Sequence, residues 1–180
     1  MGEKMKKALF TLVLTAALAV PALAENLVPN GDFRQFDPKT GKPAGWVFIR
    51  CNEVVEEGPG VTPVLRMCSY YRSKTGGWKG NAAVVIPKMP AGKYRFRLKT
   101  RGSANQLYFF LIPPKNSGLK TITVNCRKNS MTPLADNWRS GEYTVFLPSD
   151  LTGVRLTLEG FFAEPGEYEY LADLKIEPVK

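Results

Sequence analysis

The sequence has no histidine and only three cysteines. Without histidine, a Ser-His-Asp or Cys-His catalytic arrangement and a histidine-based metal site are excluded. The acidic residues are scattered through predicted turns, and no pair of them has the pattern of a general acid with a nucleophile. A tyrosine-based lyase stays chemically open because tyrosine, arginine and lysine are present, although no motif points to one. The composition therefore favours a protein that is not an enzyme.

Long apolar runs are also scarce, and the one that occurs lies at the start of the chain. Three lysines precede the run ALFTLVLTAALAV, and PALA follows it with the small residues of a cleavage site. This arrangement is typical of a secretory signal peptide, since the apolar run is too short for a comfortable membrane span. We expect cleavage after Ala24, a secreted or periplasmic bacterial product, and one domain over residues 25–180.

Acidic residues are outnumbered, with 25 Lys and Arg against 16 Asp and Glu and a formal charge of +9. Removal of the signal peptide takes away three lysines and one glutamate, which leaves +7. An excess of this size favours anionic partners such as acidic glycans or envelope polymers, and it is equally compatible with solubility alone. The chain contains no recognisable nucleic-acid-binding motif, so we expect no nucleic-acid partner.

The few cysteines would reach an oxidising compartment on export, which predicts one disulfide and one remaining thiol. Cys51 ends the apolar run WVFIRC, and Cys68 lies in the next strand-like run, VLRMCSY. Two consecutive strands joined through EGPG can place such residues opposite each other. We therefore predict a Cys51–Cys68 disulfide, worth about 3 kcal/mol in the chain-entropy model. Cys126 alternates with Ile122 and Val124 and is predicted to be a buried thiol.

Most of the remaining chain alternates apolar and polar residues with a period of two, as strands with one buried face do. The segments KYRFRLKTR, TITVNC, YTVFL and GVRLTLEG have this pattern, and QLYFFLI is apolar on both faces, as in a central strand covered on both sides. Fourteen prolines, sixteen glycines and the lack of an apolar stripe at helical spacing argue against helix. Short strands separated by turns predict an all-β, antiparallel β-sandwich.

The start NLVPNGDF, followed by AGW, resembles carbohydrate-binding modules of families 4, 9 and 22, which are galactose-binding-like jelly rolls. Three later segments follow in the order that the resemblance requires: VVIPKMPAGKYRFRLKTRG, NWRSGEYTVFLP and EYEYLADLKIEP. The resemblance consists of spaced single residues, so it indicates a fold more strongly than a ligand. It implies that Phe33 and Trp46 fill the core and that Asn30-Gly31-Asp32 forms a tight turn or bulge near the sheet edge.

One tryptophan has no packing explanation in the sequence. Trp78 lies in the polar, glycine-rich segment SKTGGWKGN, which predicts a flexible loop, and Tyr70 and Tyr71 precede it. Aromatic rings stack on the apolar faces of sugars while nearby amides and cations bind the hydroxyls. We therefore predict Trp78, Tyr70 and Tyr71 as ligand contacts, the alternative being a tryptophan folded back over the sandwich edge. Tyr108 and Phe110 would line a concave sheet face, and burial on both sides of their strand explains them equally well.

The strand KYRFRLKTR also presents a row of cations on one face, with Arg95 and Arg97 at its centre. In one interpretation these arginines bind sulfate or uronate groups, because a planar guanidinium fork suits such anions. The interpretation that we favour is a solvated sheet face whose charge is offset by carboxylates on neighbouring strands, namely Glu142, Glu159 and Glu167.

Modules of the resembled type often carry a structural calcium between the N-terminal segment and an aspartate of the last strand, which Asp173 matches. The acidic residue that usually follows NGDF is Arg34 here, and its charge would repel a cation. Asp32 and backbone carbonyls would still offer the oxygen ligands that calcium accepts. On balance, we expect neither a bound metal nor another cofactor.

Two functional hypotheses from different classes follow. The first is an exported, non-catalytic carbohydrate-binding protein whose ligand is a neutral or acidic polysaccharide or oligosaccharide. The second is a structural or protein-interaction module of the bacterial cell envelope, without a sugar site and with an envelope protein as its partner. The fold does not choose between them, since one sandwich serves many functions.

Overall fold

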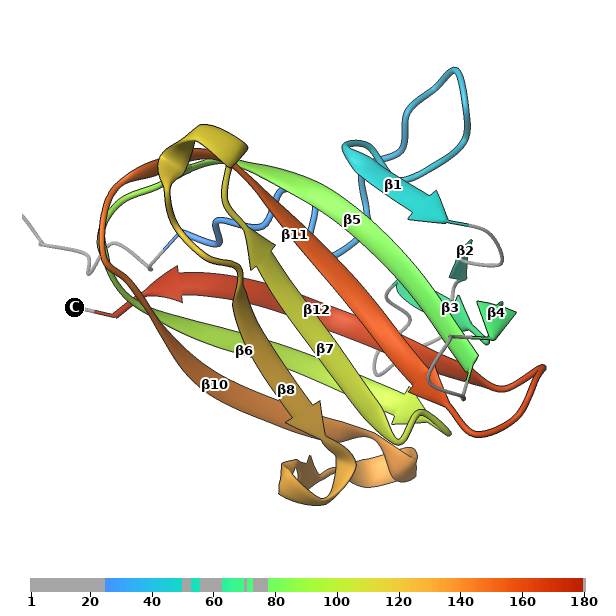
Figure 1. Cartoon of the computed structure of the whole chain (residues 1–180). Helices are drawn as coiled ribbons and strands as arrows, with labels where there is room; N and C mark the ends of the chain where they lie inside the picture. Colours follow the sequence, from blue (N-terminus) through green and yellow to red (C-terminus); the bar gives the residue numbers. More distant parts are fainter. Residues whose placement is uncertain (1–24, 50–52, 56–62, 70, 73–77, 180) are drawn as a thin grey trace, which may run out of the picture.

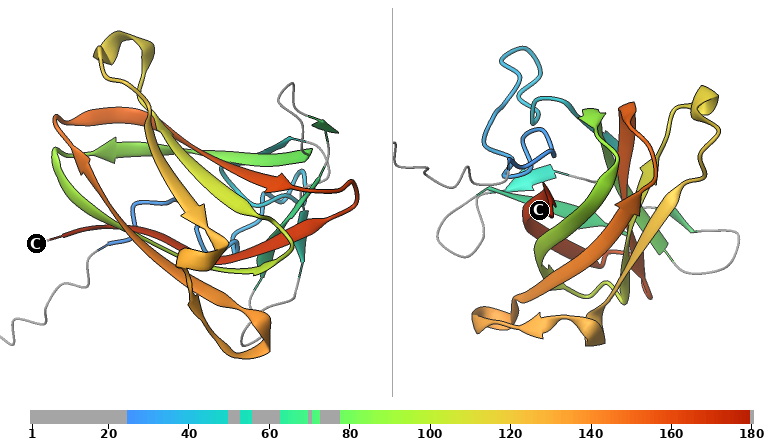
Figure 2. Two further views of the ribbon diagram at one scale, coloured as in Figure 1. Left: turned by 60° about the horizontal axis from the view of Figure 1, so that its bottom comes forward. Right: turned by 90° about the vertical axis from the view of Figure 1, so that its left-hand side faces the viewer.

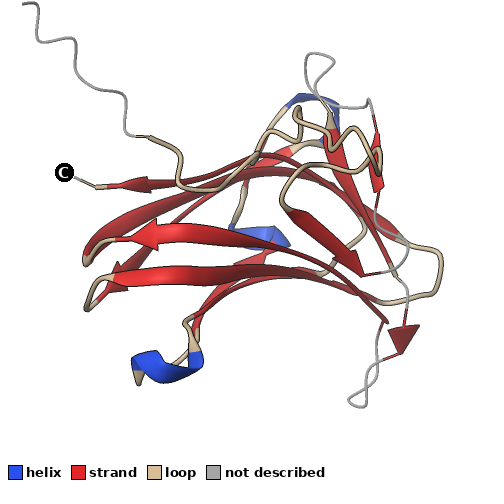
Figure 3. Ribbon diagram, turned by 90° about the horizontal axis from the view of Figure 1, so that it is seen from above, coloured by secondary structure: helices blue, strands red, loops and turns tan. Residues whose placement is uncertain are grey.

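The computed structural model describes residues 25–49, 53–55, 63–69, 71–72 and 78–179. Strands dominate it, and the helices are single 3-10 turns (Figure 3). In this part of the chain no helix has the length and apolar character needed to cross a membrane. The elements are β1 (Trp46–Ile49), β2 (Glu53–Val55), β3 (Val64–Cys68), β4 (Tyr71–Arg72), β5 (Trp78–Met89), β6 (Gly92–Gly102), β7 (Gln106–Ile112), η1 (Lys115–Ser117), β8 (Ile122–Arg127), η2 (Lys128–Ser130), β9 (Thr132–Pro133), η3 (Ala135–Asn137), β10 (Arg139–Leu147), β11 (Leu151–Phe162) and β12 (Tyr168–Pro178).

The strands form two antiparallel sheets that pack face to face (Figures 1 and 2). The first sheet has the order β1-β5-β11-β7-β8, with β4 paired to β5. The second has the order β2-β3-β12-β6-β10-β9. Strands that follow each other in the chain lie either side by side in one sheet, as β7 and β8 do, or in different sheets, as β5 and β6 do. This confirms the predicted antiparallel β-sandwich.

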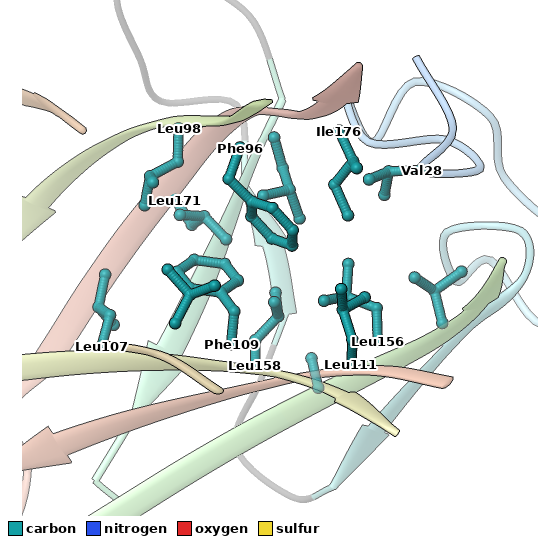
Figure 4. Close-up of a cluster of buried hydrophobic side chains, with 14 of the residues drawn as sticks. Val28, Phe96, Leu98, Leu107, Phe109, Leu111, Leu156, Leu158, Leu171 and Ile176 are labelled. Carbon is teal, nitrogen blue, oxygen red and sulfur yellow. The ribbon is translucent and has the colours of Figure 1, made fainter. Parts of the chain in front are cut away.

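The core lies between the sheets and is built from the inward-facing residues of the alternating strands (Figure 4). Phe96 from the second sheet meets Phe109 from the first, with ring centroids 5.7 Å apart. The predicted alternation holds in β6, β8, β10 and β11, whose inward-facing residues are buried or half-buried. Trp138 is buried as well, but in a separate cluster with Val64, Tyr170 and Ala172.

The strand QLYFFLI differs from the expectation of burial on both faces. In β7 the residues Leu107, Phe109 and Leu111 are buried, whereas those between them remain half-buried. β7 also lies next to the edge strand β8 and not at the centre of its sheet. Since no described element covers its outer face, the apolar side chains there meet solvent.

The N-terminal segment closes one side of the core as the resemblance implies. Phe33 is fully buried and lies 5.1 Å from the Trp46 ring, centroid to centroid. The Trp46 indole Nε1 donates to the carbonyls of Pro29 and Asn30 at 3.2 Å each. A Cβ on Gly31 would come within 2.3 Å of the Leu174 carbonyl oxygen, so this turn accepts only glycine without a backbone shift.

The predicted Cys51–Cys68 disulfide stays a prediction, because Cys51 lies outside the described residues. No disulfide joins two cysteines within the described residues. Cys126 is buried, and desolvation raises the pKa of its thiol to about 12, as expected for an unreactive core thiol.

One carboxylate is buried at the end of the sandwich. Glu169 is 3% exposed, and it accepts hydrogen bonds from the Thr100 hydroxyl and from the Ala104 backbone N–H at 2.9 Å. Its pKa is raised, mainly by desolvation, although these hydrogen bonds and the charges of Lys128 and Arg139 act in the opposite direction. The folded state therefore holds the Glu169 proton more tightly than the unfolded chain does.

We expect Trp46→Ala to lower the free energy of unfolding by about 3–5 kcal/mol, because it removes a large core aromatic and its two indole hydrogen bonds. Val47→Ala is the matched control, since Val47 is 62% exposed and should change stability by less than about 0.5 kcal/mol. Urea denaturation of both variants measures the difference. Equal stability of the two variants would contradict the core assignment.

We expect Glu169→Gln to change how stability depends on pH. Because the folded pKa lies above the ordinary value of 4.5, the stabilising contribution is complete below that value and is lost as pH rises through the folded pKa. The unfolding free energy of the wild type should therefore fall relative to that of Glu169→Gln as the pH is raised. Denaturant titrations from acid to neutral pH test this, and a difference that is constant with pH would refute it.

Candidate functional site

The outer face of the first sheet carries half-buried aromatic residues. Leu107, Phe109 and Leu111 of β7 point into the core, so the alternation sends Tyr108 and Phe110 to the outside. Their rings are nearly parallel, with centroids 5.9 Å apart and an interplanar angle of 6°. The same alternation that fills the core thus exposes two aromatic rings in a row.

A third ring joins them from the neighbouring strand. Phe161 of β11 lies opposite Gln106 of β7 in the sheet register. Its ring centroid is 5.0 Å from that of Tyr108, at 63°. We call the surface formed by Tyr108, Phe110 and Phe161 the aromatic face.

Polar groups adjoin the central ring of the aromatic face. The Tyr108 hydroxyl donates to Gln106 Oε1 at 2.5 Å and accepts from Asn125 Nδ2 at 3.4 Å. Asn125 Oδ1 is buried and accepts no hydrogen bond from the described residues. The polar side chains of Gln106 and Asn125 thus lie beside the Tyr108 ring.

The sheet register extends the aromatic face into a band that crosses five strands, β8, β7, β11, β5 and β1. Tyr108 lies opposite Asn125 on one side and Glu159 on the other, and Glu159 lies opposite Asn81 of β5. A parallel row runs through the neighbouring positions Thr123, Phe110, Thr157, Ala83 and Val47. The band therefore alternates aromatic rings with amides, hydroxyls and one carboxylate.

This combination suits a sugar chain. The faces of aromatic rings bind the C–H faces of sugar rings, and side-chain amides and carboxylates exchange hydrogen bonds with sugar hydroxyls. Glu159 is the one carboxylate in the rows that the described residues form.

The structure places the predicted aromatic contacts at one end of this sheet. Trp78 begins β5 and pairs with Phe162 and Arg72, so the prediction of a flexible loop at Trp78 is wrong for its backbone. Tyr71 belongs to β4, opposite Lys79. Trp78 lies in a strand because β5 pairs there with β4 on one side and with β11 on the other. The side chains of Trp78 and Tyr71 and the whole of Tyr70 lie outside the described residues.

Arg95 and Arg97 lie on the outer face of the second sheet, on the opposite side of the sandwich from Tyr108. Both arginines pair with Glu142, with Nε–O distances of 3.1 and 3.2 Å, and Arg97 also pairs with Glu177 at 3.4 Å. These partly exposed ion pairs contribute little stability each. Glu142 thus offsets the charge of the two arginines, as the favoured interpretation expects. Glu159 does not, because its strand β11 belongs to the other sheet.

The two carboxylates considered for calcium are engaged elsewhere. Asp173 pairs with Lys99 Nζ at 2.6 Å, and Asp32 accepts the Arg34 backbone N–H at 3.4 Å. No cluster of three potential metal-binding side chains occurs among the described residues. The Asn26 side chain joins the N-terminal segment to β12, donating to the Leu174 carbonyl at 3.1 Å and accepting from the Ile176 N–H at 2.9 Å.

The sequence analysis placed Tyr108 on an outer face of a sheet but did not identify three residues that lie beside it there. Phe161, Asn125 and Glu159 all occupy the non-core positions of strands whose alternation was recognised. The signal was therefore present in GVRLTLEGFF and TVNC. It was not usable without the strand order, which alone brings β8 and β11 to the two sides of β7.

No family model and no curated protein sequence matches the chain. Solved structures do match it. A family-61 carbohydrate-binding module in complex with β-1,4-galactotriose has a TM-score of 0.58 and 15% identity, over 87% of this chain and all of the module. The family-27 module CBM27-1 of Caldicellulosiruptor saccharolyticus, in complex with mannohexaose, has a TM-score of 0.51 and 15% identity, over 81% and 96%.

A family-4 module matches with a TM-score of 0.51 and 13% identity, over 84% of this chain and 99% of the module. These structures are covered almost completely, so the likeness extends to whole modules and not to a shared fragment. At such identities the likeness establishes the fold. This chain has the galactose-binding-like β-sandwich fold of carbohydrate-binding modules.

Proposed function

We propose that this chain is an exported, non-catalytic carbohydrate-binding protein that holds a polysaccharide on its aromatic face. The observation that carries the proposal is the contact of Tyr108 with two further half-buried rings, Phe110 and Phe161, beside the polar side chains of Gln106 and Asn125. The rings provide stacking area, and the side-chain amides provide groups for hydrogen bonds with sugar hydroxyls. The match to whole carbohydrate-binding modules supports the same proposal.

The ligand that fits this face best is a neutral glycan. Its described residues contain aromatic, amide and hydroxyl groups around a single carboxylate, Glu159, and amides and hydroxyls exchange hydrogen bonds with uncharged sugar hydroxyls. Trp78, Tyr70 and Tyr71 are proposed to extend the contact at the end where β4 and β5 pair. We propose export on the basis of the predicted signal peptide and a non-catalytic role on the basis of the match to whole carbohydrate-binding modules.

We expect Phe110→Ala and Tyr108→Ala to weaken binding of a neutral polysaccharide by about 1–3 kcal/mol, roughly 5- to 160-fold in Kd. The loss follows from removing a stacking ring, because the core residues of β7 are unchanged. Isothermal titration with β-1,4-galactan, xylan and mannan oligosaccharides measures it. Binding should be insensitive to salt, since stacking involves no ion pair.

Phe146→Ala is the matched control for these ring deletions. Phe146 is 67% exposed on β10 of the second sheet, and its loss should leave glycan affinity unchanged. Equal losses in all three variants would contradict the aromatic face as the site. No binding across neutral and acidic polysaccharides would instead favour the envelope-module hypothesis.

We also propose that the folded chain needs no calcium. A site filled to 100 times its Kd would add about 2.7 kcal/mol of stability, or several degrees in melting temperature for a chain of this size. We expect the melting temperature with excess calcium to equal that with a chelator, because Lys99 and Arg34 occupy the two aspartates. A rise of several degrees on adding calcium would overturn this proposal.

A further inference from the structure

Strand β8 is the outermost strand on one side of the first sheet, and its outer edge has no strand partner among the described residues. β8 pairs with β7, with Cys126 opposite Leu107, and comes last in the strand order (Figure 1). In an antiparallel pair, only every second residue directs its N–H and C=O toward the neighbouring strand. Over the six residues of β8, about three N–H and three C=O groups therefore point away from β7.

The hydrogen bonds of the described residues leave most of this edge open. Apart from the pairing with β7, one bond in this part of the chain reaches the β8 backbone, from the Ser130 hydroxyl to the Arg127 carbonyl at 2.8 Å. That bond lies at the very end of the strand. The rest of the edge is a template on which a further extended chain forms backbone hydrogen bonds.

The other outer strands offer less backbone for pairing. β1 has four residues, β2 has three, and β4 and β9 have two each, with Pro133 in β9 lacking an N–H. Short strands and prolines are features that protect sheet edges from further pairing. β8 has six residues and contains no proline, glycine or lysine. Among the described edge strands, β8 therefore has the length and the backbone that strand addition needs.

The side chains of β8 determine which pattern a neighbouring strand would need. Ile122 is half-buried against the core, and Val124 and Cys126 are buried, whereas Thr123 is exposed. Side chains directly opposite each other on neighbouring strands lie about 4.5–5.5 Å apart and interact. A strand beside β8 therefore fits with apolar residues on the side of Ile122 and with polar residues on the side of Thr123.

The segment around β8 carries charge of one sign. From position 103 to position 135 the sequence contains no Asp or Glu and four cations, Lys115, Lys120, Arg127 and Lys128. Lys120 and Arg127 lie at the two ends of β8, and both are exposed. The ion pairs within the described residues involve neither of them, whereas the cations in the middle of β6 are paired with carboxylates. Both ends of the open edge are thus positively charged.

This charge distinguishes between a second copy of the chain and a different partner. Antiparallel pairing of two β8 strands about Val124 would place Lys120 of each copy opposite Lys128 of the other. Like charges directly opposite each other destabilise a strand pair. A segment with carboxylates at both ends would instead form charge-assisted hydrogen bonds with these cations.

We propose that β8 binds an extended segment of another protein as an added strand of the first sheet. The segment has alternating apolar and polar residues, and acidic residues at both of its ends. Backbone hydrogen bonds along β8 provide affinity, and the alternation and the end charges provide specificity. This edge is separate from the aromatic face, and the proposal does not rest on the proposed function.

A fluorescein-labelled peptide with three Val-Thr repeats between paired glutamates is the probe, and fluorescence anisotropy measures its binding to the chain. We expect binding that weakens as salt is raised, because exposed charges are screened. A second peptide carries N-methyl groups on two adjacent central residues, which removes one N–H donor from each of its edges. It should bind at least about tenfold more weakly. Equal binding of both peptides would indicate attraction to charge alone and overturn the proposal, as would no binding of the first peptide.

Matched charge reversals locate the site. Lys120→Glu combined with Arg127→Glu should weaken binding of the acidic peptide about tenfold or more and should allow a peptide with lysines in place of the glutamates to bind. Lys39→Glu combined with Lys42→Glu is the control, because it changes the net charge equally at exposed positions before β1, at the other edge of the sheet. The control should leave the affinity unchanged. Equal weakening by both double variants would overturn the assignment to β8.

Hydrogen exchange and sedimentation test the occupant of the edge. The bound peptide should slow amide exchange in β8 and leave exchange in β1 unchanged, and protection of β1 without β8 would overturn the proposal. The chain alone should sediment as a monomer. A dimer in which the β8 amides are protected would assign the edge to a second copy and would also overturn it.

Discussion

The structure depends on the requirement that each strand bury one face against the other sheet. Phe96 and Phe109 meet across this interface, and the residues two positions away from each follow them into the core. Because successive side chains in a strand point to opposite sides, every inward residue fixes an outward neighbour. The binding surfaces are consequences of this rule: Tyr108 and Phe110 face outward because Leu107, Phe109 and Leu111 face inward.

The N-terminal segment completes the interface where the sheets alone would leave it open. Phe33 and Trp46 fill the gap, and Asn26 ties the segment to the last strand through hydrogen bonds with Leu174 and Ile176. Gly31 permits the close approach of the two backbones. The side-chain amide of Asn26 thus links the N-terminal segment to the last strand.

The two sheets present different chemistry to solvent. The first carries aromatic rings with amides and hydroxyls, and the second carries alternating cations and carboxylates that pair across strands. At the end of β6, Arg101 lies between Trp138 and Tyr170.

The sequence by itself determined the class of fold and the inward residues of the alternating strands, because a period of two requires only neighbouring residues. The core role of Phe33 and Trp46 was implied by the resemblance to carbohydrate-binding modules. The sequence also nominated Tyr108. It misjudged β7 as covered on both sides and the segment around Trp78 as a loop, because both depend on which strands become neighbours.

Only the tertiary structure decided which outward side chains meet. Phe161 and Asn125 reach Tyr108 because β11 and β8 flank β7, and Arg101 reaches Trp138 and Tyr170 because β10 and β12 flank β6. Strand order and register are set by pairing between segments far apart in the chain, whose free energy is shared over the whole core. No local pattern encodes that choice, and the sites therefore emerge only when the sandwich is closed.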